Sequence, residues 1–217
     1  MRLEIASRKA IEYACKNFHY AKIVPAHAFG FSVFNIKNEW CGVITYGGGA
    51  GAYMGSPYGL TFGKYLELNR MALNGKQEST SKAMSISIKL IKKMNPTIKL
   101  LISYADKGQN HLGIIYQSTN WYFVDESESS GEEVYYKGKW SHNRTPSEKL
   151  SKENYRLLKK RVKAGKYKYL YPLTIDMKEL CEKLKKPYPK KSVKNIESDV
   201  TPFQEDEGGA TPTLTHQ

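Results

Sequence analysis

The stretch Leu101–Trp121 reads LISYADKGQNHLGIIYQSTNW, and it carries more structural information than any other part of the chain. An apolar run from Lys99 to Tyr104 has the length of a buried β-strand. A helix-like segment follows at Asn110–Thr119 and contains Tyr116. A strand followed closely by a helix predicts a domain of the α/β or α+β class with one sheet.

Hydrophobic periodicity predicts the elements on either side of this stretch. Ser7–Phe18 repeats apolar residues on one helical face, with Ser7 as a plausible N-cap. Phe29–Ile36 and Glu39–Tyr46 flank Lys37-Asn38 and predict a hairpin. The remaining expected helices are Ser79–Lys93, Glu153–Lys163 and Asp176–Leu184, and the remaining strands are Tyr65–Leu73, Trp121–Val124, Val134–Lys137 and Tyr167–Leu173. The glycine-rich segment Gly47–Gly63 and the acidic segment Asp125–Glu133 are expected to be loops.

Composition excludes several classes of protein. The chain has 217 residues and is 40% hydrophobic, which suits one domain with a buried core. It contains no apolar run of about 18 residues, so we expect no membrane span. The N-terminus lacks the apolar region of a secretory signal. The three cysteines are scattered, which favours a reducing compartment such as the cytoplasm.

The net charge of +13 is concentrated near the C-terminus. Residues 149–194 hold 16 Lys or Arg against 4 Asp or Glu. Such a field favours a polyanion such as double-stranded DNA through counterion release, although a lysine-rich solvated surface has the same composition. We therefore divide the chain into a core (1–148), a basic C-terminal extension packed on the core (149–191) and a disordered tail (192–217).

Basic and aromatic residues alternate in the segment KKRVKAGKYKYLY, residues 159–171. Lysines can meet phosphates and tyrosines can stack on bases, but a strand with one buried aromatic face shows the same alternation. The residues expected to contact nucleic acid are Lys159, Lys160, Arg161, Lys163, Lys166 and Lys168.

Tyr116 and Trp121 occupy the Tyr and Phe places of the pattern N-x-x-A-x-x-x-Y-x-x-x-G-F, with Gln109 and Asn120 replacing the Asn and the Gly. This pattern resembles the acyl-CoA-binding core of the GNAT acyltransferases. The resemblance implies a mixed sheet in which two parallel strands, Tyr65–Leu73 and Lys99–Tyr104, splay apart to admit the acyl carrier. It also implies that Tyr116 protonates the leaving group; the alternative is a tyrosine that only packs.

In a GNAT fold, the link between Leu73 and the next helix would hold the pyrophosphate of the carrier. The residues expected to bind such a cofactor are Ser79, Thr80 and Ser81, together with Arg70 from the preceding strand. The link lacks the paired glycines of the usual GNAT motif, so Ser79, Thr80 and Ser81 have an alternative role as helix caps. The expected cofactor is acetyl-CoA or a related acyl donor, and the missing glycines leave open another phosphorylated donor or a donor bound differently.

The sequence S-Y-A-D followed by G-x-x-H-x-G-x-x-Y-Q-x-x-N-W resembles the Mom proteins of bacteriophages. Four further pieces agree in order: His19-Tyr20-Ala21-Lys22, Cys41-Gly42-Val43-Ile44, Glu67-Leu68-Asn69-Arg70-Met71 and Pro187-Tyr188-Pro189-Lys190. The resemblance covers about residues 7–191. It implies an enzyme that makes N6-(methylcarbamoyl)adenine in DNA, in the host cytoplasm, and so shields phage DNA from restriction.

The same resemblance implies an iron-dependent site. His19, Tyr20 and Asp106 are the implied metal ligands, and Tyr116 lies with them. These N and O donors suit iron or a similar divalent metal. A redox-capable metal would help because the N6 amine of adenine is a poor nucleophile. Taken alone, His19 is more often a satisfied core or surface histidine than a ligand.

Other polar residues are candidates for the same site. Ser103, at the end of its strand, is expected to position substrate. Glu67 and Arg70 are three apart in a strand, which places them on opposite faces. Arg70 could bind a phosphate or an acyl carboxylate, or form an ion pair at the core edge. His111 could be a ligand, a base or a helix cap.

Two other functions fit the sequence. One is an acetyl-CoA-dependent N-acetyltransferase that acts on a protein or small-molecule amine. The other is a non-catalytic DNA-binding protein on a GNAT-like scaffold. In each case the partners are DNA or a small molecule rather than a membrane, and a homodimer is possible.

Overall fold

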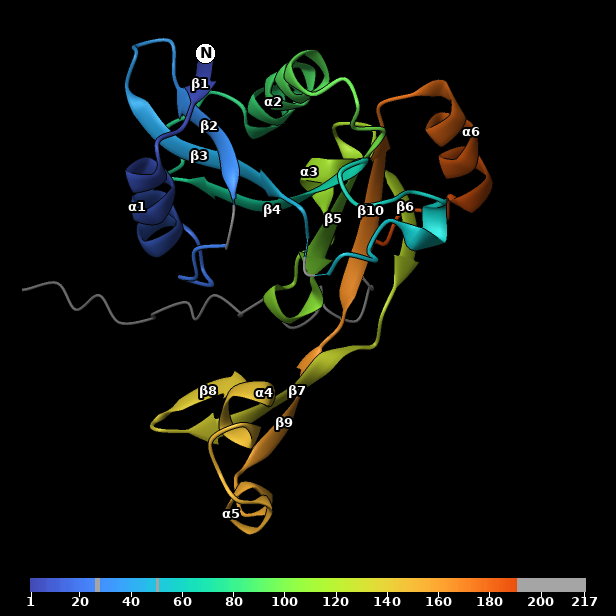
Figure 1. The fold of residues 1–217 in the computed structure, drawn as a ribbon. Coiled ribbons are helices and arrows are strands. Elements are labelled where there is room, and N and C mark those ends of the chain that lie inside the picture. The colour runs from blue at the N-terminus through green and yellow to red at the C-terminus, as the bar shows by residue number, and fades with distance from the viewer. Residues whose placement is uncertain (26–27, 50, 191–217) are drawn as a thin grey trace, which may run out of the picture.

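The computed structural model describes residues 1–25, 28–49 and 51–190 (Figure 1). One large sheet and the helices around it form the upper body of the molecule, and a second, small sheet projects below it. No helix in the described residues is long and apolar enough to cross a membrane.

The large sheet has seven strands in the order β1-β2-β3-β4-β5-β10-β6. Its strands are β1 (Arg2–Ile5), β2 (Phe29–Phe34), β3 (Trp40–Gly47), β4 (Tyr65–Leu73), β5 (Leu100–Asp106), β6 (Tyr122–Glu126) and β10 (Lys166–Pro172). Every neighbouring pair is antiparallel except β4 and β5, which are parallel. This is the mixed α/β sheet that the sequence predicts.

The parallel pair separates soon after it forms. Pairing between β4 and β5 runs only from Tyr65 opposite Leu100 to Glu67 opposite Ile102. Strand β4 nevertheless continues to Leu73 and β5 to Asp106, so the two strands splay apart over their second halves. Figure 1 shows them diverging. The expectation of splayed central strands, the GNAT-like arrangement, is confirmed.

Helices cover both faces of the sheet, and alternation along the strands decides which residues each helix meets. Helix α2 (Thr80–Met94) and α3 (Ile114–Gln117) pack on one face, where Leu101 of β5 is fully buried. Helix α1 (Arg8–Phe18) packs against Val43 and Ala72 on the other face. Helix α6 (Ile175–Leu184) shares that face and meets Ile102.

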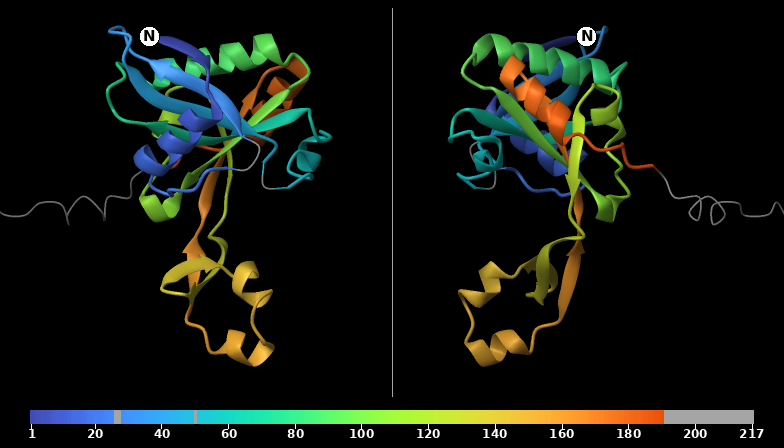
Figure 2. Two further views of the ribbon diagram at one scale, coloured as in Figure 1. Left: turned by 60° about the vertical axis from the view of Figure 1, so that its left-hand side comes forward. Right: turned by 90° about the vertical axis from the view of Figure 1, so that its right-hand side faces the viewer.

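A projecting arm, residues 129–164, extends from the end of the large sheet (Figure 2). Its sheet has three strands in the order β8-β7-β9, with β7 at Ser129–Tyr136, β8 at Lys139–His142 and β9 at Lys160–Ala164. The short helices α4 (Arg144–Ser147) and α5 (Lys152–Arg156) connect β8 to β9. The chain enters the arm from β6 and leaves it into β10, so both sheets share two continuous stretches of chain.

Most expected elements are present, the helix expected at Asn110–Thr119 is limited to the four residues of α3, and two assignments are wrong. The segment Glu153–Lys163 is helical only at its start and then forms β9, because pairing with β7 overrides its helical propensity. The segment Asp125–Glu133 is not a loop: β6 runs into it and β7 begins within it. The 3-10 turns η1 (Ser56–Tyr58) and η2 (Lys107–Gln109), with β1, β8 and α4, are additional.

The basic segment that begins at residue 149 enters both sheets, since β9 lies beside β7 and β10 lies between β5 and β6. The division into a core (1–148) and a C-terminal extension (149–191) therefore stays a prediction, in which the extension is the part that contacts DNA. The tail expected at 192–217 lies outside the described residues.

Candidate functional site

A cavity of about 590 Å³ opens where β4 and β5 separate. This volume lies within the usual range for a small-molecule site, about 300–1,000 Å³. Its walls come from the second halves of both strands, the end of α1, the start of α2 and the segment that leads into α3. Among the expected site residues, those that line it are His19, Tyr20, Arg70, Thr80, Asp106, Tyr116 and Lys166.

Tyr116 lines this cavity and forms a hydroxyl pair with Ser103, which is buried behind it and is not a lining residue. Their side-chain oxygens lie 2.8 Å apart, and Ser103 Oγ also lies 2.8 Å from the carbonyl oxygen of Leu68. A carbonyl can only accept, so the single Ser103 proton satisfies Leu68 while the Tyr116 hydroxyl donates to Ser103. Burial raises the pKa of Tyr116 to about 12, so the phenol keeps its proton at neutral pH.

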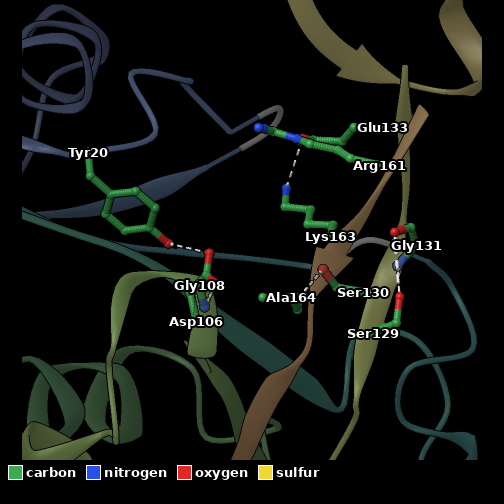
Figure 3. A network of polar contacts seen from close by, with 10 residues as sticks. All are labelled: Tyr20, Asp106, Gly108, Ser129, Ser130, Gly131, Glu133, Arg161, Lys163 and Ala164. Atoms are coloured by element: carbon green, nitrogen blue, oxygen red, sulfur yellow. Dashed lines mark hydrogen bonds and ion pairs between the residues drawn. The ribbon is translucent and has the colours of Figure 1, made fainter. Parts of the chain in front are cut away.

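Tyr20 and Asp106 form a second pair at the rim. The Tyr20 hydroxyl donates to Asp106 Oδ2 over 3.2 Å, and Asp106 Oδ1 accepts the backbone N–H of Gly108 (Figure 3). Burial first, and then the Asp106 charge and hydrogen bond, raise the pKa of Tyr20 to about 12. Both carboxylate oxygens of Asp106 thus have donors, and the Tyr20 ring is 49% exposed beside them.

His19 stacks on Tyr20 with ring centroids 4.4 Å apart. The backbone N–H of Ala21 donates to His19 Nδ1 over 3.1 Å. Burial first, and then the charge of Arg70, lower the pKa of His19 to about 4, so the ring is neutral at neutral pH. Because Nδ1 accepts a hydrogen bond, the one ring proton lies on Nε2. His19 therefore offers a donor at Nε2 rather than a free base.

Glu67 and Arg70 both line the cavity, so the expectation that they point to opposite faces is wrong. The pairing of β4 with β3 passes from Leu68 opposite Tyr46 to Arg70 opposite Thr45 and skips Asn69. This β-bulge adds one residue and restores Glu67 and Arg70 to the same side of the strand. The Arg70 guanidinium donates to the carbonyls of Asn69 and Ile23.

The start of α2 also contributes to the cavity wall. Thr80 lines it, whereas Ser79 and Ser81 are not among its lining residues. Ser79 is the N-cap of α2 and accepts the backbone N–H of Lys82, and the Ser79 and Ser81 hydroxyls lie 3.0 Å apart. The capping alternative therefore describes Ser79. Thr80 alone of the three is placed to meet a ligand in the cavity.

A scan against protein-family models matches residues 1–190 to the Mom protein family. This chain belongs to the Mom family. The methylcarbamoylase Mom of Escherichia phage Mu is 35% identical over 83 residues, which are 37% of this chain and 34% of that protein. The chain thus spans about a third of the length of the curated relative that it matches.

Solved structures of GNAT acetyltransferases also resemble this Mom family member. A Bacillus subtilis acetyltransferase in complex with CoA has 8% identity and a TM-score of 0.47, covering 80% of this chain and 99% of its own. A GNAT family acetyltransferase from Elizabethkingia anophelis with acetyl-CoA bound has 10% identity and a TM-score of 0.42, covering 79% and 97%. The strand order and the split described above define the fold of this chain.

The Mom resemblance implies iron on His19, Tyr20 and Asp106, but these side chains do not form a ready metal site. No three His, Cys, Asp or Glu side chains gather as possible ligands among the residues that the structure describes. The Tyr20 phenol keeps its proton, and Nε2 of His19 carries one. Both donor atoms would have to lose a proton first. His19, Tyr20 and Asp106 of this Mom family member thus lie together without a metal-ready set of free donor atoms, and iron stays a prediction of the resemblance alone.

The basic residues expected to contact nucleic acid fall into separate places. Lys159, Lys160, Arg161 and Lys163 are exposed on the arm. Lys166 lines the cavity, with its Nζ 5.6 Å from the centre of the Tyr104 ring. Lys168 lies on β10 opposite Asp125 of β6. These six residues therefore do not lie together on one basic surface.

The cavity also contains residues that the sequence does not single out for it. Asn69 and Asn110 line it, and so do Tyr104, expected at the ligand end of its strand, and His111, a candidate for the same site. The bulge at Asn69 has no sequence signal of its own, because it depends on pairing with β3. The T-shaped contact of His111 with Tyr20, 5.7 Å between centroids, places His111 at the rim.

Proposed function

We propose that this chain transfers an acyl-type group, methylcarbamoyl, to N6 of adenine in double-stranded DNA. Membership of the Mom family supports a role in phage DNA modification. The observation that carries the proposal is that Tyr116, held by Ser103, lines a cavity that two splayed strands open. In this proposal the enzyme acts in the host cytoplasm and protects phage DNA from restriction.

Different parts of the cavity lining suit two different ligands. Thr80 and the N-terminus of α2 suit the phosphorylated part of an acyl donor. A base extruded from a duplex would enter beside Tyr20 and Asp106, which also line the cavity. Trp121 does not hold such a base, because its side chain is fully buried. The exposed ring of Tyr20 is the aromatic surface available there.

The reaction requires one proton to move from the amine to the leaving group. The N6 nitrogen attacks the donor carbonyl carbon, a C–N bond forms, and the bond to the leaving group breaks. Tyr116 gives its proton to the leaving group and takes up the proton that N6 releases. Ser103 holds the phenol oxygen in place, and its own hydroxyl can turn from Leu68 to Tyr116 while that oxygen is negative.

Arg70 adds a positive charge close to this chemistry, since it lines the cavity and lowers the pKa of His19. A guanidinium in that position can hold a phosphate of the donor or of the DNA backbone. Nε2–H of His19 is a hydrogen-bond donor available to the same group or to a carbonyl oxygen.

Mass analysis of nucleosides from the DNA of cells that express the chain tests the proposal. A new adenosine species with the mass of a methylcarbamoyl adduct is the expected result. Unmodified nucleosides together with an acetylated protein or small molecule would replace the proposal with an ordinary N-acetyltransferase. DNA retained on a column with no transfer product at all would indicate a non-catalytic binding protein.

A further inference from the structure

The side chains on one face of the arm sheet gather around Glu133. Glu133 of β7 lies opposite Arg161 of β9, and Tyr135 of β7 lies opposite Trp140 of β8. Residues opposite or two apart in a sheet share a face. We call this surface the open face; its residues are Glu133, Tyr135, Trp140, Arg161 and Lys163.

The other face of the same sheet is buried at Val134, whereas Lys160 and Val162 on that face are exposed. Val134 and Lys160 lie opposite each other there, and Val134 is fully buried. Lys160 Nζ lies 5.0 Å from the centre of the Tyr155 ring, which comes from α5. The side chains of β9 therefore divide between two environments: Lys160 points toward α5, and Arg161 and Lys163 belong to the open face.

Aromatic and cationic side chains contact each other on the open face. The Arg161 guanidinium carbon lies 4.4 Å from the Trp140 ring centre, and the Tyr135 and Trp140 rings are 5.5 Å apart. Tyr135 is 43% exposed, so the aromatic surface is accessible to a partner. Arginine stacked on tryptophan beside an exposed tyrosine suits phosphates and the planar parts of nucleotides.

Glu133 holds the two cations of this face in position. Its carboxylate accepts two hydrogen bonds from Arg161, at 2.7 and 3.0 Å, and lies 3.5 Å from Lys163 Nζ (Figure 3). The hydrogen bond from Arg161 is the main reason that the pKa of Glu133 is lowered, so the carboxylate stays charged. One acid against two cations leaves a net positive charge that a phosphate can neutralise.

The base of the arm is attached to the rim of the cavity. The backbone N–H of Lys107 donates to the carbonyl of Gly165 over 3.1 Å, and Lys107 follows Asp106 directly. Lys166, the next residue after Gly165, lines the cavity itself. In the view of Figure 3, Arg161 and Lys163 leave β9 on the side where Tyr20 and Asp106 lie.

We propose that the open face of the arm binds the DNA duplex next to the adenine that enters the cavity. Arg161 and Lys163 contact backbone phosphates, and Trp140 and Tyr135 pack against the nucleotides that these phosphates join. This inference rests on the proposed function, in which duplex DNA is the substrate. The proposed DNA contact is thus one defined surface instead of the whole basic segment 159–168. Lys160 lies on the other face of the sheet, near Tyr155, and is not part of this contact.

Binding of a fluorescently labelled DNA duplex, measured by anisotropy over a range of salt concentrations, tests this surface. Arg161→Ala and Lys163→Ala should each reduce the slope of log K against log salt by about 0.9, the value for one phosphate contact. Trp140→Ala should weaken binding about tenfold with an unchanged slope, because no charge is removed. Glu133→Gln should tighten binding several-fold, since the cations lose their competing carboxylate.

Lys160→Ala is the matched control, because it removes the same charge from the same strand on the opposite face of the sheet. For Lys160→Ala, the slope of log K against log salt should stay at the wild-type value. Thermal unfolding should show that all variants remain folded. A loss in Lys160→Ala equal to that in Arg161→Ala, or weaker binding by Glu133→Gln, would overturn the proposal.

The modified adenine content of DNA from cells expressing the same variants separates this inference from the proposed function. If wild type modifies DNA and Arg161→Ala and Trp140→Ala modify it equally well, the open face is wrong and the function stands. If wild type binds DNA through this face but produces no modified adenine, the proposed function fails and the binding surface stands.

Discussion

The Tyr116 hydroxyl and Ser103 Oγ lie 2.8 Å apart, on elements that face each other across the end of the split sheet. Tyr116 comes from α3 and Ser103 from β5, just beyond the last residue of β5 that pairs with β4. If β4 and β5 stayed paired, Leu68 would lie opposite Ser103 and its carbonyl could accept a backbone N–H of β5. The split instead leaves the Leu68 carbonyl to the Ser103 side chain, which then fixes the phenol.

Tyr116→Phe should abolish DNA modification while the fold remains intact. The ring still packs against Tyr169 and Trp121, and Ser103 keeps its bond to Leu68, so the loss of stability should be about 1 kcal/mol. The leaving group, however, loses its proton donor. Nucleoside mass analysis and thermal unfolding measure the two effects separately.

Tyr169→Phe is the control for Tyr116→Phe. Tyr169 stacks on Tyr116 and is also buried, but its hydroxyl donates to the Leu112 carbonyl instead of facing Ser103. Modification should survive this change. Wild-type levels of modified adenine in Tyr116→Phe would remove Tyr116 from the mechanism.

The stability of the fold should fall in mild acid because of His19. The pKa of His19 is lowered from 6.5 to about 4 by burial and by Arg70, so the unfolded chain binds more protons than the folded one between these values. The contribution of His19 is complete above pH 6.5 and is lost as the pH falls through 4. Denaturant unfolding of wild type and His19→Gln between pH 7 and 4 measures it, and the difference between the two proteins should shrink with acidity. A constant difference would show that His19 titrates normally.

Arg70→Gln should raise the pKa of His19, because the Arg70 charge is the second cause of its depression. Arg70→Lys keeps the charge and should leave the histidine closer to its wild-type value. NMR titration of the His19 ring in the two variants measures the effect without any assay of transfer. Equal pKa values in both variants and wild type would place the Arg70 charge away from His19.

The order of the main elements could be predicted because most of them follow local rules. Strand β4 begins and ends at the expected Tyr65 and Leu73, and Ser7 and Ser79 cap their helices as expected. The segments that were assigned wrongly depend on partners distant in the sequence. Strand β9 is rich in lysine and becomes a strand only because β7 lies beside it.

The candidate site was predictable only through the resemblance. His19 and Asp106 are far apart in sequence, and no spacing rule relates them. In the structure the Tyr20 hydroxyl donates a hydrogen bond to Asp106, and Tyr116 lines the same cavity. The bulge at Asn69, the tautomer of His19 and the two faces of the arm depend on three-dimensional contacts, so they could not be predicted from the sequence.

Gly165 should be the residue on which the position of the arm depends most. It lies between β9 and β10, where the chain crosses the junction of β6 and β7, and a Cβ at this position would collide with the backbone of Ser127. Three hydrogen bonds join the same crossing: Ser127 N–H to the Lys166 carbonyl, Lys166 N–H to Ser127 Oγ, and Lys107 N–H to the Gly165 carbonyl. Gly165→Ala must therefore separate the two stretches of chain that support the arm.

We expect Gly165→Ala to lower the free energy of unfolding by more than about 2 kcal/mol, to expose the arm to protease and to abolish DNA modification. Gly51→Ala is the control, because a Cβ there meets no atom within 4 Å. Limited proteolysis followed by mass analysis locates the cuts, which should fall between β6 and β10 in the variant and not in the control. If Gly165→Ala resists protease as wild type does and modifies DNA fully, the crossing at Gly165 does not fix the arm against the cavity.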